Sequence, residues 1–484
     1  MAGPLATAGW HERFEAWARP VAADAQGPGV AVAVAAEGRL LAMDGFGARD
    51  REAGLEITPD TVFGIGSVTK SFTAVAVLQL QERGLLSVED PVARYLPELG
   101  VPNVDGPGAM RLHHLLTHTS GLPPLATLMP AMLASLKADP GVAAAMGLPE
   151  SALEGAEPID GPDEMIACLN RTEIRPLGRP GEVFSYSNDG YALLGEIVSR
   201  VSGEGYEAYL RRHVLEPAGM ARTTIDLGRL AGDPDIAVLY ARRRKGEGDS
   251  RGEVVRSPLW WESPAMAPAG FLRSTAADLL RYLEIFRTGG TTGGVRILSE
   301  ASVRAMTARH VPCDVGSYYG YGLFTTPDHD GVTLVGHGGA VKGVAAEIMF
   351  VPERALTAVG LANLAGAPTG RLVIGALNAC LGLDPETPRV RLPDLPGVDD
   401  DDIAGVYTAE EGGRVEVHVA DGAVSAELGG ERRPARRVGE RAYAISLPGH
   451  EMVLRFLTLS DGETAVQSGF RVLRRATPAY GAAG

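Results

Sequence analysis

The chain has 484 residues and a formal net charge of −15, with 45% hydrophobic and 22% charged residues. This length exceeds that of one ordinary domain and predicts two or three units, while the composition is that of a globular protein. The acidic balance argues against nucleic acids and anionic membrane surfaces as partners.

Cysteine and histidine usage predicts neither a disulfide framework nor a metal site. Cys168, Cys313 and Cys380 are odd in number and widely spaced. His114 and His118 lie four residues apart, but no Glu-x-x-His signature or third ligand accompanies them.

The first residues lack the apolar segment of a signal peptide, and no apolar run approaches the length of a membrane span. We therefore expect a cytoplasmic protein that needs no metal or cofactor.

The N-terminal region predicts an amphipathic helix, a hairpin and a buried helix. The first helix covers residues 9–22. Valine and alanine alternate over 29–35, and after a turn a second strand runs over 40–45. The apolar segment after Ser67 predicts a buried helix that ends near Gly84, a natural C-terminal cap.

Helical patterns dominate from residue 88 to residue 383, and strands return near the end of this region. Helices are predicted at 113–116, 191–201, 276–286 and 370–381, and strands at 332–335, 344–351 and 356–362. Because strands occur at both ends, we expect an α/β (α+β) fold with one antiparallel sheet and an inserted all-helical subdomain. Residues 123–177 are rich in alanine, methionine and proline, and form either a helical lid or a surface insertion.

The C-terminal region predicts a separate all-β unit. A proline-rich stretch and an acidic run indicate a linker over residues 392–402. Short alternating strands with Asp-Gly turns follow at 405–407, 414–419, 423–428, 443–447 and 452–459. The expected domains are therefore a first domain at 1–391 and a small β barrel or sandwich at 403–484.

Ser67 and Lys70 form a Ser-x-x-Lys motif in front of the buried helix. Three residues are just under one helical turn, so the two side chains share a face and the amine reaches the hydroxyl. A serine needs a neighbouring base, and a lysine serves as one if burial and nearby cations lower its pKa from about 10.4. Lysine is scarce, with four in the chain, and only Lys70 follows a serine at this spacing. The alternative is a helix-capping serine followed by a surface lysine.

A second motif, Tyr186-Ser187-Asn188, directly precedes a predicted helix. In an extended or tight-turn segment, residues two apart point the same way. Tyr186 could then shuttle a proton beside Lys70, and Asn188 could hold a substrate carbonyl or orient the lysine. The alternative is a core tyrosine beside a helix-capping asparagine.

A third motif, His337-Gly338-Gly339-Ala340, follows the strand predicted at 332–335. Paired glycines let a substrate backbone lie against the edge of a strand. The amides of Ala340 and Ser67 could together form an oxyanion hole. His337 would supply a hydrogen-bond donor or a positive charge facing the substrate, or else be an ordinary turn histidine.

The order of these motifs resembles that of the penicillin-recognising serine hydrolases: Ser67-x-x-Lys70, Tyr186-x-Asn188, His337-x-Gly339. The chain is similar to their class C β-lactamase-like branch, which includes family VIII esterases, D-aminopeptidases and D-Ala-D-Ala carboxypeptidases. Segments typical of that branch are 63–70, 115–122, 268–278 and 319–323. The resemblance covers roughly residues 29–383 and implies a serine β-lactamase-like fold. The C-terminal unit is similar to the lipocalin-like domains of such peptidases, which can shape or cap the active site.

The resemblance implies that Ser67 attacks a carbonyl, that Lys70 and Tyr186 transfer protons, and that Asn188 helps to bind the substrate. The oxyanion would lie between the amides of Ser67 and Ala340, and water would resolve the acyl-enzyme. His337, Gly339 and Ala340 would complete the substrate-binding group.

One departure from the family pattern bears on the substrate. Where β-lactamases and carboxypeptidases usually carry Lys-Thr-Gly, this chain has His337-Gly338-Gly339, which weakens carboxylate recognition. We therefore expect a serine hydrolase acting on small esters or amides, including D-amino-acid peptides. The alternatives are a β-lactamase or carboxypeptidase, and a non-catalytic β-lactam sensor or scaffold protein. The expected partner is a small-molecule or short-peptide substrate, without membrane insertion, and a homo-oligomer stays open.

Overall fold

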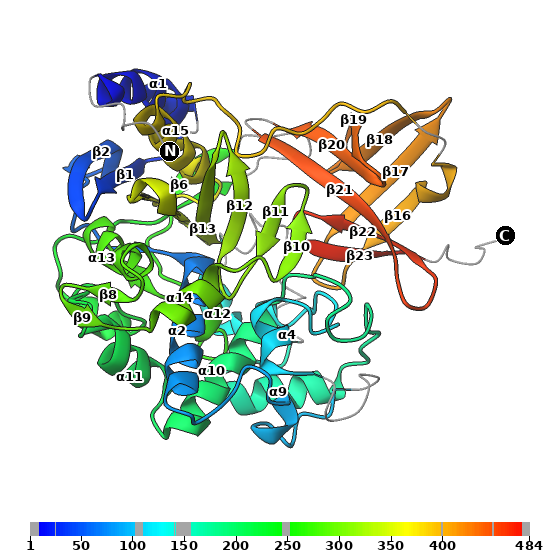
Figure 1. Cartoon of the computed structure of the whole chain (residues 1–484), viewed down its shortest axis with the longest axis horizontal. Coiled ribbons are helices and arrows are strands. Elements are labelled where there is room, and N and C mark those ends of the chain that lie inside the picture. The colour runs from blue at the N-terminus through cyan, green and yellow to red at the C-terminus, as the bar shows by residue number, and fades with distance from the viewer. Residues whose placement is uncertain are drawn as a thin grey trace.

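The structure of the chain, a computed structural model, describes residues 9–24, 26–101, 110–139, 141, 156–243, 252–397, 400–447 and 450–476. Two bodies lie side by side: a sheet flanked by helices, and a closed β barrel formed by the C-terminal strands (Figure 1). The fold class expected from the sequence is therefore confirmed.

Among the described residues, nine strands form one antiparallel sheet in the order β10-β11-β12-β13-β14-β15-β1-β2-β3. The strands are β1 (Gly29–Ala36), β2 (Arg39–Asp50), β3 (Leu55–Glu56), β10 (Val311–Asp314), β11 (Ser317–Tyr319), β12 (Phe324–His329), β13 (Val332–Val341), β14 (Val344–Val351) and β15 (Leu356–Ala362). β1 pairs with β15, with Val30 opposite Ala362, so the two ends of the domain meet in the sheet as expected. The sequence analysis missed β10 to β12, where prolines at positions 312 and 327 interrupt the apolar alternation.

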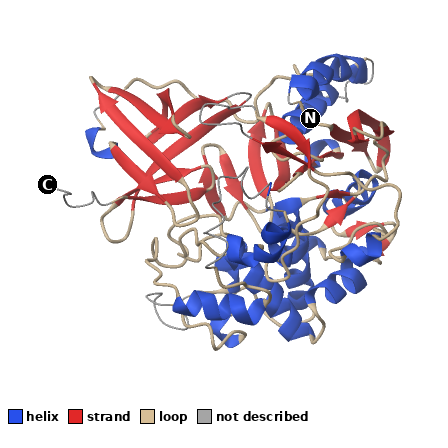
Figure 2. Ribbon diagram, turned by 180° about the vertical axis from the view of Figure 1, so that it is seen from behind, coloured by secondary structure: helices blue, strands red, loops and turns tan. Residues whose placement is uncertain are grey.

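Helices cover both faces of this sheet (Figures 1 and 2). One face is covered by α1 (Trp10–Asp24) and α15 (Thr369–Leu381), whose apolar residues share a core with β1 and β15. The helical subdomain comprises α2 (Thr69–Glu82), α4 (Leu112–Leu116), α5 (Leu128–Ala131), α6 (Leu133–Ala138), α9 (Pro162–Arg171), α10 (Asn188–Ser202), α11 (Tyr206–Leu210), α12 (Ala267–Gly270), α13 (Ala276–Arg287) and α14 (Glu300–Thr307). In α2, every residue from Thr69 to Leu80 is buried, which explains the continuous apolar segment of the sequence.

Shorter elements connect these parts. Three small two-stranded sheets pair β4 (Phe63–Gly64) with β7 (Arg273–Ser274), β5 (Tyr240–Arg243) with β6 (Glu253–Arg256), and β8 (Thr291–Thr292) with β9 (Val295–Arg296). The short helical turns are η1 (Gly66–Val68), η2 (Val92–Arg94), η3 (Arg211–Leu215), η4 (Leu227–Leu230), η5 (Pro352–Arg354) and η6 (Asp401–Ile403). No helix in the described part of the chain is long and apolar enough to span a membrane.

The C-terminal strands close into an eight-stranded antiparallel barrel. They are β16 (Gly405–Thr408), β17 (Arg414–Ala420), β18 (Ala423–Leu428), β19 (Glu431–Gly439), β20 (Ala442–Leu447), β21 (His450–Thr458), β22 (Thr464–Ser468) and β23 (Arg471–Arg475). The sequence predicts five of these strands and misses β19, β22 and β23. β19 carries four arginines and a proline, and β22 and β23 have five residues each, so their hydrophobic alternation is weak.

The barrel packs against the β10 edge of the sheet (Figures 1 and 2). The Gln467 amide of β22 donates a hydrogen bond to the Cys313 carbonyl of β10. Leu177 of the first domain is buried in one cluster with Leu459 and Val472 of the barrel. A sheet edge that would otherwise present unpaired backbone groups is thus covered by the second body.

The linker predicted at 392–402 follows the barrel surface where it is described. The Pro393 carbonyl accepts a hydrogen bond from Arg436 at 2.6 Å, and the Asp402 carboxylate pairs with Arg441 at 2.7 Å. The boundary itself stays a prediction, and residues 398 and 399 lie outside the described part.

Of the proposed lid at 123–177, residues 140 and 142–155 lie outside the described part of the chain. The described remainder packs into the helical core, where Leu133 and Leu136 are buried.

Candidate active site

Ser67 lies on the tight turn that joins β4 to α2. Gly66 has a φ of +50°, a left-handed conformation that suits glycine, and the Thr69 hydroxyl donates to its carbonyl at 2.7 Å. Ser67 follows in η1 and is half-buried, whereas Lys70, three residues later in α2, is fully buried. The turn thus presents the hydroxyl to the surface and keeps the amine beneath it.

The Lys70 amine lies within hydrogen-bonding distance of three oxygens. They are the Ser67 hydroxyl at 3.2 Å, the Asn188 Oδ1 at 2.8 Å and the Ala269 carbonyl of α12 at 2.6 Å. The last two oxygens can only accept hydrogen bonds, so they take two N–H groups. In a neutral amine the lone pair is then left facing Ser67, which is the arrangement that a general base requires.

The surroundings of Lys70 favour its neutral form. Burial lowers its pKa well below the ordinary value, and the charge of Arg471 lowers it further, while Asp189 opposes both. The amine also lies 4.8 Å from the centre of the Tyr186 ring. The conditions named above for a lysine base are therefore present: a buried amine with a neighbouring cation.

Tyr186 and Asn188 flank the start of α10. Ser187 caps this helix, because its hydroxyl accepts a hydrogen bond from the Gly190 amide at 3.0 Å. Asn188 is therefore the first helical residue and is free to bind Lys70 rather than to cap. The Ser187 amide donates to His118 Nδ1 at 3.1 Å, so a buried histidine of the turn after α4 holds this segment in place.

The Tyr186 hydroxyl lies near the Ser67 side chain. Burial raises the pKa of Tyr186, while the neighbouring Ser67 side chain and the charge of Arg471 oppose this rise. No partner of ordinary hydrogen-bond geometry reaches this hydroxyl among the described residues. A buried hydroxyl next to the nucleophile is suited to pass a proton rather than to stabilise the core.

Gly339 lets β13 approach the Ser67 turn unusually closely. A Cβ atom at this position would lie 1.9 Å from the Ile65 carbonyl oxygen and 3.0 Å from the Ser67 nitrogen. A Cβ atom on Gly66 would in turn lie 2.5 Å from the Ala340 nitrogen. The backbone nitrogens of Ser67 and Ala340 therefore lie near each other, and the oxyanion hole expected from these two amides stays a prediction.

His337 does not fit either role expected for it. It is 2% exposed, and burial and the nearby Lys70 lower its pKa to about 3, so it is neutral. Its Nδ1 donates to the Gly338 carbonyl at 2.5 Å, and its Nε2 accepts from the Tyr319 hydroxyl at 3.2 Å. Both ring nitrogens are therefore engaged inside the protein, and the histidine offers the substrate neither a positive charge nor a free donor.

The sequence analysis missed two groups at this site that come from the barrel. The Phe470 carbonyl accepts a hydrogen bond from the Tyr186 amide at 2.8 Å, and the Arg471 guanidinium lies 5.3 Å from the centre of the Tyr186 ring. Phe470 lies in the turn between β22 and β23, and Arg471 begins β23. Arg471 is one of 41 arginines and has no local motif around it, so no sequence signal pointed to it.

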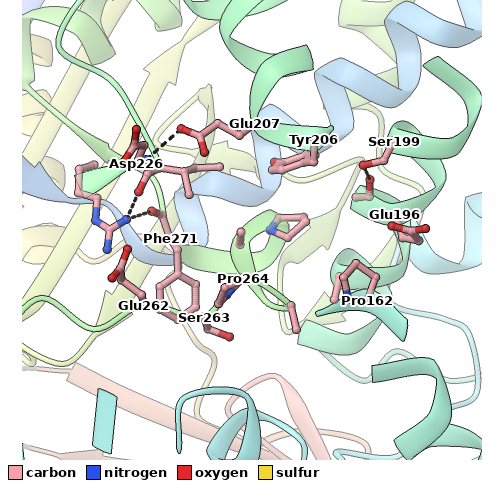
Figure 3. Close-up of a pocket in the computed structure, with 17 residues that line it drawn as sticks. Pro162, Glu196, Ser199, Tyr206, Glu207, Asp226, Glu262, Ser263, Pro264 and Phe271 are labelled. Atoms are coloured by element: carbon pink, nitrogen blue, oxygen red, sulfur yellow. Dashed lines mark hydrogen bonds between the residues drawn. The ribbon is translucent and has the colours of Figure 1, made fainter. Parts of the chain in front are cut away.

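A separate pocket of about 340 Å³ lies between α10, α11 and the segment around α12 (Figure 3). Glu196, Glu207, Asp226 and Glu262 contribute carboxylates to its wall. None of the predicted site residues lines it, and Glu207 is already bound to the Asp226 amide at 2.9 Å. The pocket borders α10 and α12, which also hold Asn188 and Ala269, but it contains none of the reacting groups, and we do not assign the chemistry to it.

Comparison with known proteins agrees with this geometry. The family model described as Beta-lactamase matches residues 14–380. The chain belongs to the β-lactamase family. Penicillin-binding protein 4 of Amycolatopsis lactamdurans is 29% identical over 425 residues, which is 84% of this chain and 99% of that protein. Esterase EstB of Burkholderia gladioli is 33% identical over 277 residues, which is 54% of this chain and 65% of that protein.

Among solved structures, the octameric penicillin-binding protein homologue from Pyrococcus abyssi is similar over both bodies of this β-lactamase family member. It is 29% identical with a TM-score of 0.69, and the match covers 96% of this chain and 99% of that one. The likeness therefore extends from the family domain into the C-terminal barrel.

Proposed function

We propose that the chain is a serine hydrolase that cleaves small esters or amides through an acyl-enzyme on Ser67. The contact that carries this proposal is the one between the buried Lys70 amine and the Ser67 hydroxyl, at 3.2 Å. Membership of the β-lactamase family supports it, and so does the similarity to the esterase EstB.

The proposed reaction begins with proton transfer from Ser67 to the neutral Lys70 amine. The Ser67 oxygen attacks the substrate carbonyl, and the amides of Ser67 and Ala340 stabilise the resulting oxyanion. Lys70 then gives this proton to Tyr186 as Tyr186 passes its own proton to the leaving alcohol or amine, which departs as the acyl-enzyme forms and leaves Lys70 neutral again. Water, activated by the same Lys70–Tyr186 pair, attacks the acyl carbon and releases Ser67.

The third motif favours substrates without a carboxylate that the enzyme would have to bind. His337 is neutral and already hydrogen-bonded on both ring nitrogens, and Gly338 and Gly339 have no side chain. On β13, therefore, no side chain of this motif is available to pair with a substrate anion. This supports esters and amides, including D-amino-acid amides, over β-lactams and peptides with a free carboxyl terminus.

The test is steady-state turnover by wild type and Ser67→Ala on three chromogenic substrates: a short-chain nitrophenyl ester, a D-alanine nitroanilide and a cephalosporin. We expect Ser67-dependent turnover of the ester or the anilide and little of the cephalosporin. Fast cephalosporin turnover would instead favour a β-lactamase. A single acylation of Ser67 without turnover would identify a sensor.

We also infer a homo-oligomer, and the octameric assembly of the Pyrococcus abyssi homologue supports this inference. Sedimentation velocity of the full chain tests it, and a monomer at micromolar concentration would contradict it.

A further inference from the structure

The turn between β22 and β23 of the barrel is fixed to the active site by its backbone. The Phe470 carbonyl accepts from the Tyr186 amide at 2.8 Å, and the Val472 amide donates to the Ser185 hydroxyl at 3.3 Å. The Phe470 ring lies 4.6 Å from that of Phe324 in β12. The residue between Phe470 and Val472, Arg471, is therefore held in a defined position relative to the catalytic pair.

Arg471 brings a positive charge to the ring that Lys70 also faces. Its guanidinium carbon lies 5.3 Å from the centre of the Tyr186 ring, and the Lys70 amine lies 4.8 Å from the same point. Glu411, in the loop between β16 and β17, forms an ion pair with Arg471. The barrel thus supplies both the cation and the carboxylate that anchors it.

The other titratable groups that the described part of the chain places around Lys70 do not supply a positive charge. His118 and His337 are buried, and burial lowers the pKa of both, so they are neutral. Tyr186 and Tyr191 present their rings to the amine at 4.8 and 5.6 Å, and burial raises the pKa of both tyrosines, so they are neutral as well.

Asp189, the residue after Asn188, is the carboxyl group that opposes Arg471. It is 4% exposed, bound to the Thr127 hydroxyl at 2.5 Å, and its ionised form favours the charged form of Lys70. A protonated Lys70 cannot accept the Ser67 proton. Burial raises the pKa of Asp189, whereas the Thr127 hydrogen bond and the charges of Arg471 and Lys70 lower it. Among these groups, Arg471 is the cation that offsets the effect of an ionised Asp189 on Lys70.

We propose that Arg471 is a positioning residue that keeps the Lys70–Tyr186 pair in its proton-accepting form, so that the barrel is part of the catalytic machinery. Arg471 acts through this pair and not on the substrate. The inference rests on the proposed function, because it names the group that tunes the same site. The positive charge of Arg471 lowers the pKa of whichever group acts as the base, Lys70 or Tyr186, since a nearby cation favours the deprotonated form of lysine and of tyrosine alike.

The chain offers a matched control on the same strand. Arg474 also binds the first domain, through the Pro176 carbonyl, and pairs with Asp461 at 2.9 Å. It does not contribute to the pKa shifts of Lys70 or Tyr186. Arg474→Gln weakens the docking of the barrel without removing the charge at the site, whereas Arg471→Gln removes that charge.

The direct measurement is the pKa of Lys70 by NMR of protein labelled with ¹³C-lysine. The chain has four lysines, and the Lys70 signal is the one lost in Lys70→Ala. We expect Arg471→Gln to raise the Lys70 pKa by about one unit, and Glu411→Gln to lower it by less. Arg471→Lys should stay near wild type, and Arg474→Gln should not move it. An unchanged Lys70 pKa in Arg471→Gln would overturn the proposal.

The second readout is the pH profile of kcat/KM on a neutral ester. Activity should rise with pH as the base deprotonates, and Arg471→Gln should move this acid limb to higher pH by the same amount as the Lys70 pKa. An equal shift in Arg474→Gln would mean that docking, and not charge, is responsible, and would overturn the proposal. An effect of Arg471→Gln that is confined to KM for substrates with a carboxylate would also overturn the proposal.

These two readouts separate the inference from the proposed function. A shifted Lys70 pKa in a protein that turns over no substrate would support the role of Arg471 and remove the hydrolase. Ser67-dependent turnover together with an unchanged Lys70 pKa in Arg471→Gln would support the hydrolase and remove the role of Arg471.

Discussion

The two bodies of the molecule contribute to one site in different ways. The first domain supplies Ser67, Lys70, Tyr186 and Asn188 from short motifs, in which each side chain is placed by its own turn or helix start. The barrel supplies Phe470 and Arg471 from a turn that reaches the site only because the barrel docks on β10. Groups placed by local structure can be found in a sequence, whereas groups placed by docking cannot.

The largest effect is expected from removing the nucleophile or its base. Ser67→Ala should lower kcat/KM by at least about 10⁴-fold, and Lys70→Ala by nearly as much, because the two act as a unit. Steady-state turnover on the preferred substrate measures this, with circular dichroism to confirm the fold. Activity in Ser67→Ala equal to wild type would contradict the proposed mechanism, and with it the contribution of either body to catalysis at Ser67.

The next largest effect separates catalysis from packing at Tyr186. Tyr186→Phe should lower kcat by about 10²- to 10³-fold, because it removes a proton-transfer group. It should leave the melting temperature nearly unchanged, because the hydroxyl has no ordinary hydrogen-bond partner among the described residues. Full activity with a lowered melting temperature would assign Tyr186 to the core instead.

A comparison of two neighbouring glycines tests the close approach of β13 to the Ser67 turn. Gly339→Ala should lower kcat/KM by about 10²-fold, because the new Cβ would displace the backbone at Ile65 and Ser67. Gly338→Ala is the control, since the closest atom to its Cβ would be the end of the flexible Glu347 side chain. Equal losses in the two variants would show that the contact with Ser67 is not what matters.

The smallest effect concerns the exposed ion pairs between the first domain and the barrel. Arg175 pairs with Asp461 at 3.0 Å and with Glu463 at 2.8 Å. Because these groups are solvent-exposed, Arg175→Gln should lower the free energy of unfolding by less than about 1 kcal/mol. Urea unfolding measures this. A larger loss, or one that uncouples the two bodies, would mean that these pairs hold the barrel in place.

The sequence predicted much of the fold because its pattern is local. The valine-alanine alternation of β1 and the unbroken apolar face of α2 follow directly from burial on both sides. The arginines of β19 and the prolines of β10 and β12 hide those strands, since their pairing is decided by partners far along the chain. β22 and β23 were missed because they have five residues each and their pairing also depends on partners far along the chain, and Arg471, which begins β23, was missed with them.

At the site, the sequence placed the reacting groups but not their electrostatics. The spacing of Ser67 and Lys70 predicted their contact, since both lie within one turn of a helix. The neutral state of His337 follows from its burial beside Tyr319 and Phe324, which no local pattern reveals. Ala269 likewise gives only its backbone carbonyl to Lys70, and any residue could have supplied it.

The central claim, that Lys70 activates Ser67 for covalent catalysis, is tested most directly by trapping the modified serine. Wild type and Lys70→Ala are treated with a fluorophosphonate serine probe, and the modified peptide is identified by mass spectrometry. We expect rapid modification of wild type at Ser67 alone, and modification of Lys70→Ala slowed by at least about 10³-fold. Labelling at another residue, or equally fast labelling of Lys70→Ala, would contradict the account.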